Sequence, residues 1–290
     1  MTRLVSGSLI VVGALALVLP AAGAGERWPH VVWRPGSYEV RGSVPVWVGT
    51  TRDASGARVY VARIDRSGTR LALYPGLGEP PGAWPRGLGA VPFGQRWRLL
   101  ATFNGGFKAS AAAGGFLVNG RAAVPLRTGL GTVVEGRAGR VDIVRWSGPP
   151  APRRLVLARQ NLPLLVDHGR PGAGVTDGPA WGATLHGALA VWRTALGIAR
   201  NGDLLYAAAE AQTAPSLARL MVGLGALRAI ELDINPEWPS FNSYLRRGGR
   251  DPIKLVPNPQ QSAERWLVPD RRDFFVVYTR AGGGPFVPFR

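Results

Sequence analysis

Three carboxylates lie close together in the stretch AIELDINPEWPSFNSY at residues 229–244. They are Glu231, Asp233 and Glu237, in a chain that has only 18 acidic residues against 35 Lys and Arg. Alternation along a strand would place Glu231 and Asp233 on one face and the apolar residues beside them on the other. Like charges this close repel each other unless a cation, a shared proton or a basic group intervenes. The stretch is therefore a candidate for chemistry.

The residue types leave three interpretations of this stretch open. Glu231, Asp233, Asn235 and Glu237 could together hold Ca²⁺ or another hard cation through their oxygen atoms. The carboxylates could instead form ion pairs with arginines, which are abundant in this chain. In the third interpretation one of the carboxylates is catalytic. Apart from Ca²⁺ in the first interpretation, the sequence points to no particular cofactor or metal.

Two other polar positions could bind a ligand. Arg193 lies between Trp192 and the apolar run TALGI, where a charge needs a partner, and its planar guanidinium suits a carboxylate or a phosphate. Asn104 precedes Gly105 and Gly106, where the backbone can turn sharply and approach a ligand closely. Equally, Arg193 could face solvent on an exposed sheet face, and Asn104 could belong to an ordinary turn.

The elements that must position these residues are mostly strands. Alternating apolar residues predict strands at 59–65 and 71–76, and further strands are expected at 153–166, 226–234 and 273–281. Asn-Gly pairs at 119–120 and 201–202 predict tight hairpins with positive φ at both residues, and a third hairpin should turn near residues 138–139. One short helix is expected over residues 217–224, with Ser216 as its N-cap and Gly225 following its end.

Composition supports a folded chain with a substantial core. It has 290 residues, of which 46% are hydrophobic, and no cysteine, which excludes disulfides, thiolate metal sites and a cysteine nucleophile. Many strands and few helices predict an α+β fold with strand-rich mixed or antiparallel sheets and few short helices. We expect one main domain at residues 51–290, preceded by a loosely attached N-terminal extension at residues 25–50.

The N-terminus has the features of a signal peptide over residues 1–24. Arg3 precedes an apolar run at residues 9–20, and the small residues Ala22 and Ala24 fit a cleavage site. An uncleaved anchor is the alternative, although the apolar run is shorter than the roughly 20 residues that span a bilayer. After cleavage we expect no membrane span, and a location that is secreted or in the cell envelope.

The formal net charge is +17, and all but two of the 35 basic residues are arginine. Such a surface attracts polyanions, which outside a bacterial cell are phosphate-linked wall polymers, acidic glycans and anionic lipid headgroups. We therefore predict an anionic carbohydrate or a phosphate-linked polymer as the partner. Nucleic acid is not expected, because no basic stretch carries a recognised binding motif and the chain is predicted to be exported.

The order of several segments resembles the phosphodiester glycosidase family. These segments are TFNGGF, GGFLVNG, RTALGIARNGDLLYAAAEA and LGALRAIELD, within a resemblance that extends over residues 59–278. The resemblance matches Asn104, Arg193 and Asp233 to family positions, and more loosely Glu210. It departs after Asp233, where the family usually continues with Gly-Gly-Gly-Ser and this chain has INPEW, a stiffer and bulkier segment.

The resemblance implies cleavage of a sugar joined through its anomeric carbon to a phosphodiester. Because the phosphate leaves as a weak base, a general acid is less necessary than in an ordinary glycosidase. Asp233 would activate water or stabilise the cationic sugar carbon, Arg193 would bind the departing phosphate, and Glu231 would orient Asp233. Asn104, Gly105, Gly106 and Glu210 are expected to contact the substrate.

Because the glycine loop is missing, a second interpretation of the function remains open. Asn235 and Glu237 could supply the polar contacts that the glycine backbone would have made, and Trp238 could stack on a sugar ring or serve only for packing. The sequence therefore predicts a secreted hydrolase acting on a sugar phosphodiester in an envelope glycan or glycolipid. The alternative is a non-catalytic binder of anionic cell-wall polymers with the same fold.

Overall fold

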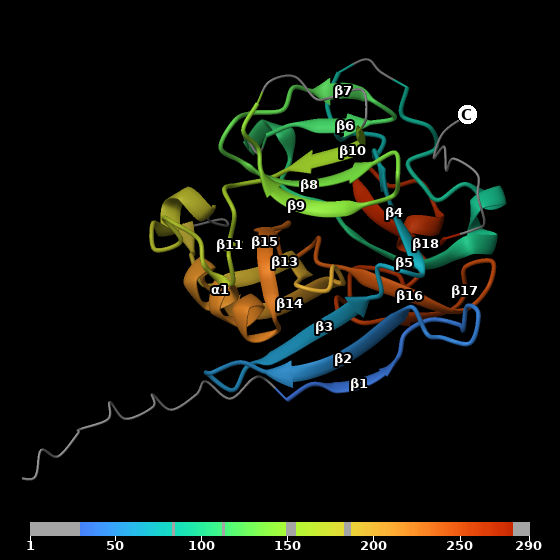
Figure 1. The fold of residues 1–290 in the computed structure, drawn as a ribbon, viewed down its shortest axis with the longest axis horizontal. Coiled ribbons are helices and arrows are strands. Elements are labelled where there is room, and N and C mark those ends of the chain that lie inside the picture. Colours follow the sequence, from blue (N-terminus) through green and yellow to red (C-terminus); the bar gives the residue numbers. More distant parts are fainter. Residues whose placement is uncertain (1–29, 83–84, 112–113, 149–154, 183–186, 281–290) are drawn as a thin grey trace, which may run out of the picture.

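Three antiparallel sheets make up a computed structural model of the chain, which describes residues 30–82, 85–111, 114–148, 155–182 and 187–280 (Figure 1). All strand pairs recorded in these sheets are antiparallel. The only α-helix among the described residues is α1 (Ala214–Gly223), together with short 3-10 turns that include η1 (Phe93–Arg98) and η3 (Gly178–Trp181). The predicted strand-rich class with few short helices is confirmed, in its antiparallel form.

The largest sheet carries two of the predicted site segments on neighbouring strands. Its order is β1-β2-β3-β14-β13-β15-β11-β12, so that β13 lies between β14 and β15. The bounds are β1 (Val32–Pro35), β2 (Val46–Arg52), β3 (Arg58–Ile64), β14 (Leu204–Gln212), β13 (Val191–Ala199), β15 (Ala226–Glu231), β11 (Val166–Asp167) and β12 (Arg170–Pro171). Arg193 and Glu231 thus come from adjacent strands.

Two five-stranded sheets pack against the first. One has the order β7-β6-β10-β8-β9 and the other the order β17-β16-β5-β18-β4. Their bounds are β7 (Arg121–Val124), β6 (Phe116–Val118), β10 (Leu155–Gln160), β8 (Gly131–Gly136), β9 (Val141–Arg145), β17 (Arg250–Lys254), β16 (Phe241–Arg246), β5 (Leu99–Asn104), β18 (Phe274–Thr279) and β4 (Thr69–Tyr74). Strand β5, which leads into Asn104-Gly105-Gly106, is buried at every residue, as expected for a strand covered on both faces.

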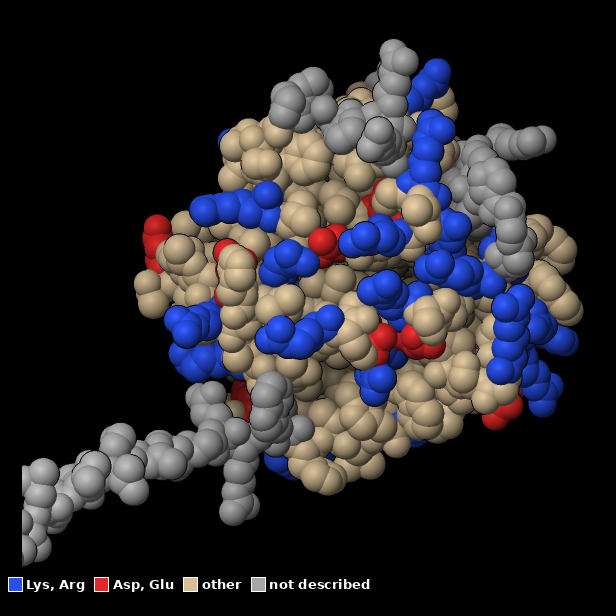
Figure 2. All heavy atoms as spheres, in the orientation of Figure 1, with Lys and Arg blue, Asp and Glu red and all other residues tan. Residues whose placement is uncertain are grey.

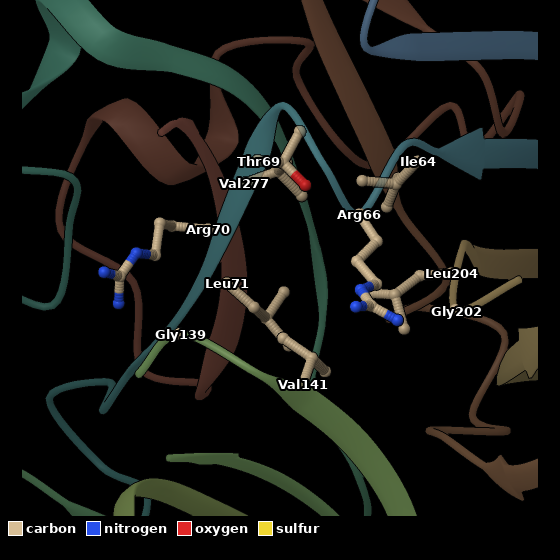
Figure 3. A pocket seen from close by; sticks show the side chains of 10 residues that line it. All are labelled: Ile64, Arg66, Thr69, Arg70, Leu71, Gly139, Val141, Gly202, Leu204 and Val277. Atoms are coloured by element: carbon tan, nitrogen blue, oxygen red, sulfur yellow. The ribbon is translucent and has the colours of Figure 1, made fainter. Parts of the chain in front are cut away.

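The core lies where the three sheets meet. Phe103 is its centre, with ring centroids 5.1 Å from Phe275, 5.8 Å from Phe241 and 5.6 Å from Tyr206. A cavity of about 10 Å³, close to the size of one water molecule, remains between residues of the three sheets (Figure 3). It is lined by apolar side chains and by two arginines, a threonine and two glycines: Ile64, Leu71, Val141, Leu204, Val277, Arg66, Arg70, Thr69, Gly139 and Gly202.

The predicted hairpins form, with one difference in the turns. Asn119 and Gly120 both have positive φ (51° and 74°), as the tight turn between β6 and β7 requires. Between β13 and β14 only Gly202 has positive φ, at 90°, because the connection is longer: the N–H of Gly202 donates to the carbonyl of Ala199. The third turn uses Gly139, at φ 71°.

The helix begins earlier than the sequence suggested. Thr213 is the N-cap: its Oγ1 accepts from the N–H of Ser216 at 3.3 Å, and Ser216 Oγ accepts in return from the N–H of Thr213 at 2.9 Å. The prediction of Ser216 as N-cap was wrong because Pro215 is tolerated in the first turn, which lets the helix start before it. Gly225 follows the helix with φ 95°, as predicted, and Met221 is buried in the core.

The predicted N-terminal extension is not loosely attached where the structure describes it. β1 and β2 pair with each other, and β2 pairs with β3 from Val46 to Arg52. Val46 and Val48 are fully buried in the core, so this segment is part of the largest sheet. The predicted signal peptide at residues 1–24 lies outside the described residues. Among those that are described, no helix has the length and apolarity needed to cross a bilayer.

The capping arrangement generates a testable expectation. Thr213→Ala removes the acceptor for the N–H of Ser216 and should lower the free energy of unfolding by about 1 kcal/mol. Urea denaturation followed by circular dichroism measures this change. Thr128→Ala, at an exposed threonine outside the helix, is the matched control and should leave the midpoint unchanged. A Thr213 variant as stable as this control would contradict the assignment of the cap.

Candidate active site

Arg193 is buried inside the largest sheet, and all its N–H groups are bonded to protein. It is 1% exposed. The acceptors are four backbone carbonyls and one carboxyl: Gln212 O (2.9 Å), Trp181 O (2.8 Å), Gly182 O (3.2 Å), Leu189 O (2.9 Å) and Glu231 Oε1 (2.5 Å). Since a guanidinium has five N–H donors, none remains for a phosphate. The expected contact between Arg193 and a departing phosphate is not available in this arrangement.

Glu231 is the carboxyl that faces Arg193. The β13–β15 register pairs Ala195 with Glu231, so a continued strand would have put Asp233 opposite Arg193. Instead β15 ends at Glu231, and the chain turns so that the N–H of Asp233 donates to Gly105 O at 3.1 Å. Burial raises the pKa of Glu231 to about 8, although the charge of Arg193 opposes this shift. Glu231 thus lies against an arginine, as the ion-pair interpretation expects, while burial favours its protonated form.

Asp233 lies just beyond the end of β15 and faces a different arginine. Its Oδ2 accepts from Arg272 Nη2 at 2.5 Å, and its Oδ1 accepts from the N–H of Asn235 at 3.1 Å. Thr194 Oγ1 donates to the backbone carbonyl of Asp233 at 2.7 Å. Asp233 is only 6% exposed, and burial raises its pKa above the ordinary value while the charge of Arg272 lowers it.

Arg272 is the site residue that the sequence did not reveal. It precedes β18, is 4% exposed, and also donates from Nη2 to Gly106 O at 2.8 Å. Its Nη1 is buried and has no hydrogen-bond partner among the described residues. A buried donor without an acceptor is costly, so this nitrogen is available for an anion. Nothing in the sequence distinguishes Arg272 from the many other arginines, including its exposed neighbour Arg271.

A second buried pair supports the first. Arg159 Nε donates to Asp273 Oδ2 at 2.8 Å, and both side chains are almost completely buried. The Gly105 backbone packs directly on this pair: a Cβ there would lie 2.2 Å from Asp273 Oδ2. At Gly106 a Cβ would lie 3.0 Å from Asn161 Oδ1. Close packing therefore requires a glycine at Gly105 and leaves little room for a side chain at Gly106, beside Arg272 and Asp233.

Asn104 acts as a connector between sheets. Its Oδ1 accepts from Tyr206 OH at 3.0 Å and from the N–H of Ser240 at 3.2 Å, while Nδ2 donates to Gly105 O at 3.1 Å and Thr194 Oγ1 at 3.0 Å. It is 2% exposed, so its amide is committed to protein partners. Asn104 thereby fixes the loop that contacts Asp233, but it does not itself face a ligand.

The segment that follows Asp233 lies against the guanidinium of Arg272. The Trp238 ring centroid is 5.6 Å from the Arg272 guanidinium and 5.2 Å from that of Arg265. Asn258 Nδ2 donates to the carbonyls of Pro236 and Glu237, each at 3.1 Å. The segment is thus tied to the rest of the protein, with the Trp238 ring against the charged pair.

The remaining predicted residues have separate positions. Asn235 uses its backbone N–H on Asp233 and its Oδ1 on the N–H of Glu237 at 3.0 Å. Glu237 is exposed. Glu210 is exposed on β14 and makes no hydrogen bond or ion pair with Asp233 in the described structure. The structure therefore brings together Asp233, Gly105, Gly106 and Trp238 from the predicted set.

The donor set does not favour the proposed Ca²⁺ site. Glu231 and Asp233 each face an arginine, which supplies the positive charge that a cation would have provided. Within the described ranges, no three Asp, Glu or His side chains lie close enough together to hold a metal ion.

Comparison with known proteins establishes the fold. No protein-family model and no curated protein sequence matches this chain. Among solved structures, the zebrafish N-acetylglucosamine-1-phosphodiester alpha-N-acetylglucosaminidase catalytic domain, auto-inhibited by its pro-peptide, aligns with a TM-score of 0.51 at 14% identity, over 87% of this chain and 88% of that one. This chain shares the fold of that catalytic domain.

Two further solved structures align less closely. A hypothetical protein from Synechocystis has a TM-score of 0.47 at 14% identity, over 87% of this chain and 64% of that one. A Burkholderia pseudomallei K96243 protein described as exported has a TM-score of 0.43 at 15% identity, over 80% and 74% of the two chains. At these identities the likeness concerns the fold alone, so the chemistry has to be argued from the residues of this chain.

The bonding of Arg193 predicts a large effect of a conservative change. Arg193→Lys offers three donors to five acceptors, so it should lower the free energy of unfolding by about 3 kcal/mol or more. Arg228→Lys is the matched control, because its pair with Asp142 is partly exposed and is expected to contribute at most about 1 kcal/mol. Chemical denaturation compares the two variants. Equal, small losses would show that the Arg193 contacts do not support the fold.

The buried carboxyls predict a pH dependence of stability. Burial raises the pKa of Glu231 to about 8 and that of Glu135, on β8 beside Arg70, to about 7, from an ordinary value of 4.5. In the window between the ordinary and raised values the folded state holds protons that the unfolded state releases. Stability from these two groups is therefore present below pH 4.5 and is lost as the pH rises through 7 to 8.

Thermal denaturation between pH 5 and pH 8 tests this. The midpoint should fall as pH rises, and Glu135→Gln should reduce the slope, because it removes one of the two titrating groups without adding a charge. A midpoint that rises over the same range would contradict the direction of both shifts.

Proposed function

We propose that this chain is an extracytoplasmic hydrolase that cleaves glycosyl-1-phosphodiester linkages of an envelope glycan or glycolipid. The observation that carries the proposal is the pair of Asp233 and Arg272, in which a buried carboxylate faces an arginine with an unbonded Nη1. The shared fold with the zebrafish phosphodiester α-N-acetylglucosaminidase domain supports the class of substrate.

Arg272 has the properties that a departing phosphate needs. Its charge is permanent, it is held in place by Asp233 and Gly106, and its free nitrogen lies in a water-poor site. Preorganised positive charge in such a site stabilises the negative charge that develops on a leaving phosphate. In this proposal Arg272 takes the phosphate-binding role that the sequence had given to Arg193.

Asp233 is the proposed reacting carboxylate. As the ionised form it would take a proton from an attacking water or stabilise the cationic anomeric carbon, while the phosphate leaves without needing a proton. Arg272 favours this ionised form and burial opposes it, so the pKa of Asp233 stays above its ordinary value. Activity should therefore appear as the pH rises through that raised pKa.

Arg193, Glu231 and Asn104 are proposed as positioning residues. Arg193 and Glu231 fix the end of β15 against β13, and Asn104 fixes the Gly105 carbonyl that accepts from Asp233. Trp238 is the proposed aromatic wall of the site, since its ring already lies against the Arg272 guanidinium.

One observation favours a second candidate, a binder of anionic wall polymers without turnover. The segment at residues 235–238 is held by Asn258 and Gln261 with Trp238 over the charged pair, so substrate must displace or share this position. The strongly basic surface would retain polymer whether or not Asp233 can react.

Release of free reducing sugar from a synthetic N-acetylglucosamine 1-phosphodiester, with related sugars alongside, tests the proposal. Asp233→Asn and Arg272→Lys should each lower the rate by about 100-fold or more, because they remove the reacting carboxylate and the planar phosphate donor. Asp167→Asn and Arg271→Lys change the same residue types at more exposed positions and should retain the wild-type rate. A fully active Asp233→Asn protein would overturn the assignment, whereas polymer retention without any turnover would favour the binder.

A further inference from the structure

The short helix η1 exposes two large aromatic side chains. Phe93 is 85% exposed and Trp97 is 62% exposed, four residues apart in this 3-10 helix. Burying such side chains in an apolar medium is worth roughly 1.5 to 3 kcal/mol each, so leaving both in water is costly. Exposed apolar groups of this size commonly mark interaction sites when they are gathered on one surface.

Two segments that are hydrogen-bonded to η1 or to each other also expose aliphatic side chains. Leu88 is 62% exposed and Val268 is 55% exposed. The segments are held together by hydrogen bonds: Arg96 Nη2 donates to Leu267 O, and the N–H of Asp270 donates to Gly89 O at 2.9 Å. We call Phe93, Trp97, Leu88, Val268 and the adjacent Arg247 the η1 surface.

Arg247 is held between two aromatic rings on this surface. Its guanidinium carbon lies 4.9 Å from the Tyr38 centroid and 4.9 Å from the Trp97 centroid. In the described part of the chain its N–H groups have no hydrogen-bond or ion-pair partner, whereas the nearby Arg246 pairs with Asp251 at 2.9 Å. The rings fix the guanidinium while its N–H edges remain available, which suits a phosphate oxygen.

The charge around the η1 surface is mainly positive. Arg96 and Arg98 lie on η1 itself, and Arg250 joins Arg246 and Arg247 at the β16–β17 turn. Basic side chains gather over the β17 side of the molecule in the view of Figure 2, with few acids among them. The patch therefore complements an anionic partner that also accepts hydrocarbon.

We propose that the η1 surface docks onto an anionic lipid bilayer, with Phe93, Trp97, Leu88 and Val268 entering the acyl boundary and Arg247 binding a headgroup phosphate. At such a boundary the Trp ring lies in an apolar medium while its N–H stays hydrated. Arginines are attracted to anionic headgroups. Exposed Leu88 and Val268 favour lipid over a soluble polyanion, because they gain nothing from a charged chain in water. This inference does not depend on catalysis.

Co-sedimentation with vesicles of phosphatidylglycerol and phosphatidylcholine, compared with phosphatidylcholine alone, tests the inference. Wild-type protein should bind the anionic vesicles more tightly. Phe93→Ser should weaken partitioning by about tenfold through lost apolar burial, and Arg247→Gln should weaken it by about fivefold through one lost headgroup contact. All proteins carry the same N-terminus, so differences in binding arise from the substituted residues.

The matched controls lie on other elements. Val32→Ser changes a residue that is 67% exposed on β1, and Arg219→Gln changes an exposed arginine on α1. Both should bind vesicles like wild type. Binding weakened equally by the controls would overturn the inference, because it would reflect overall charge or apolarity rather than the η1 surface.

Two further outcomes would also overturn it. If Arg247→Gln weakens binding but Phe93→Ser does not, and soluble polyphosphate abolishes vesicle binding, the surface recognises a soluble polyanion. If binding to phosphatidylcholine alone equals binding to anionic vesicles, the arginines are not used for headgroups. Lipid docking would be supported if both η1 variants bind anionic vesicles more weakly than wild type. Binding should also be weaker to phosphatidylcholine alone and should not be abolished by excess polyphosphate.

Discussion

A buried guanidinium must find an acceptor for each of its five N–H groups, and the arrangement of the candidate site follows from that demand. Arg193 meets it with four backbone carbonyls and Glu231. Those carbonyls belong to the end of β14 and to the loop around η3, so one side chain joins β13, β14, β15 and this loop. An arginine is suited to this task because its planar, permanently charged group cannot escape the requirement by losing a proton.

Arg272 meets this demand only in part, as do Arg228 and Arg280, which also keep a buried nitrogen without a hydrogen-bond partner among the described residues. Arg159 and Arg193 donate from every nitrogen to protein acceptors, whereas Arg272 keeps a buried Nη1 without one. The consecutive residues Arg272 and Asp273 each form an ion pair: Arg272 with Asp233, and Asp273 with Arg159. The Gly105 backbone packs on the second pair. The Arg272–Asp233 pair and the Asp273–Arg159 pair are thus packed side by side. This packing limits the positions that the Asp233 side chain can take.

The segment that contains Trp238 covers Arg272 and is tied to the rest of the protein by hydrogen bonds. Trp238 lies against Arg272 and Arg265, and Asn258 holds the backbone beneath it. The Trp238 ring therefore covers the Arg272 guanidinium that pairs with Asp233. The η1 surface is a separate feature with the opposite character, since its aromatic rings are exposed and the guanidinium of the half-buried Arg247 contacts them without a hydrogen-bond partner among the described residues.

The sequence by itself determined the strand-rich class, the hairpins and the acidic stretch, because alternation, Asn-Gly pairs and Gly225 act over a few neighbouring residues. It could not assign partners to the carboxylates. Glu231 and Asp233 are two residues apart, yet their arginines lie 38 and 39 residues away in opposite directions along the chain. Strand register alone would have paired Asp233 with Arg193. Only the tertiary structure decided otherwise, because β15 ends at Glu231 and the packing of Gly105 on Asp273 draws Asp233 toward Arg272.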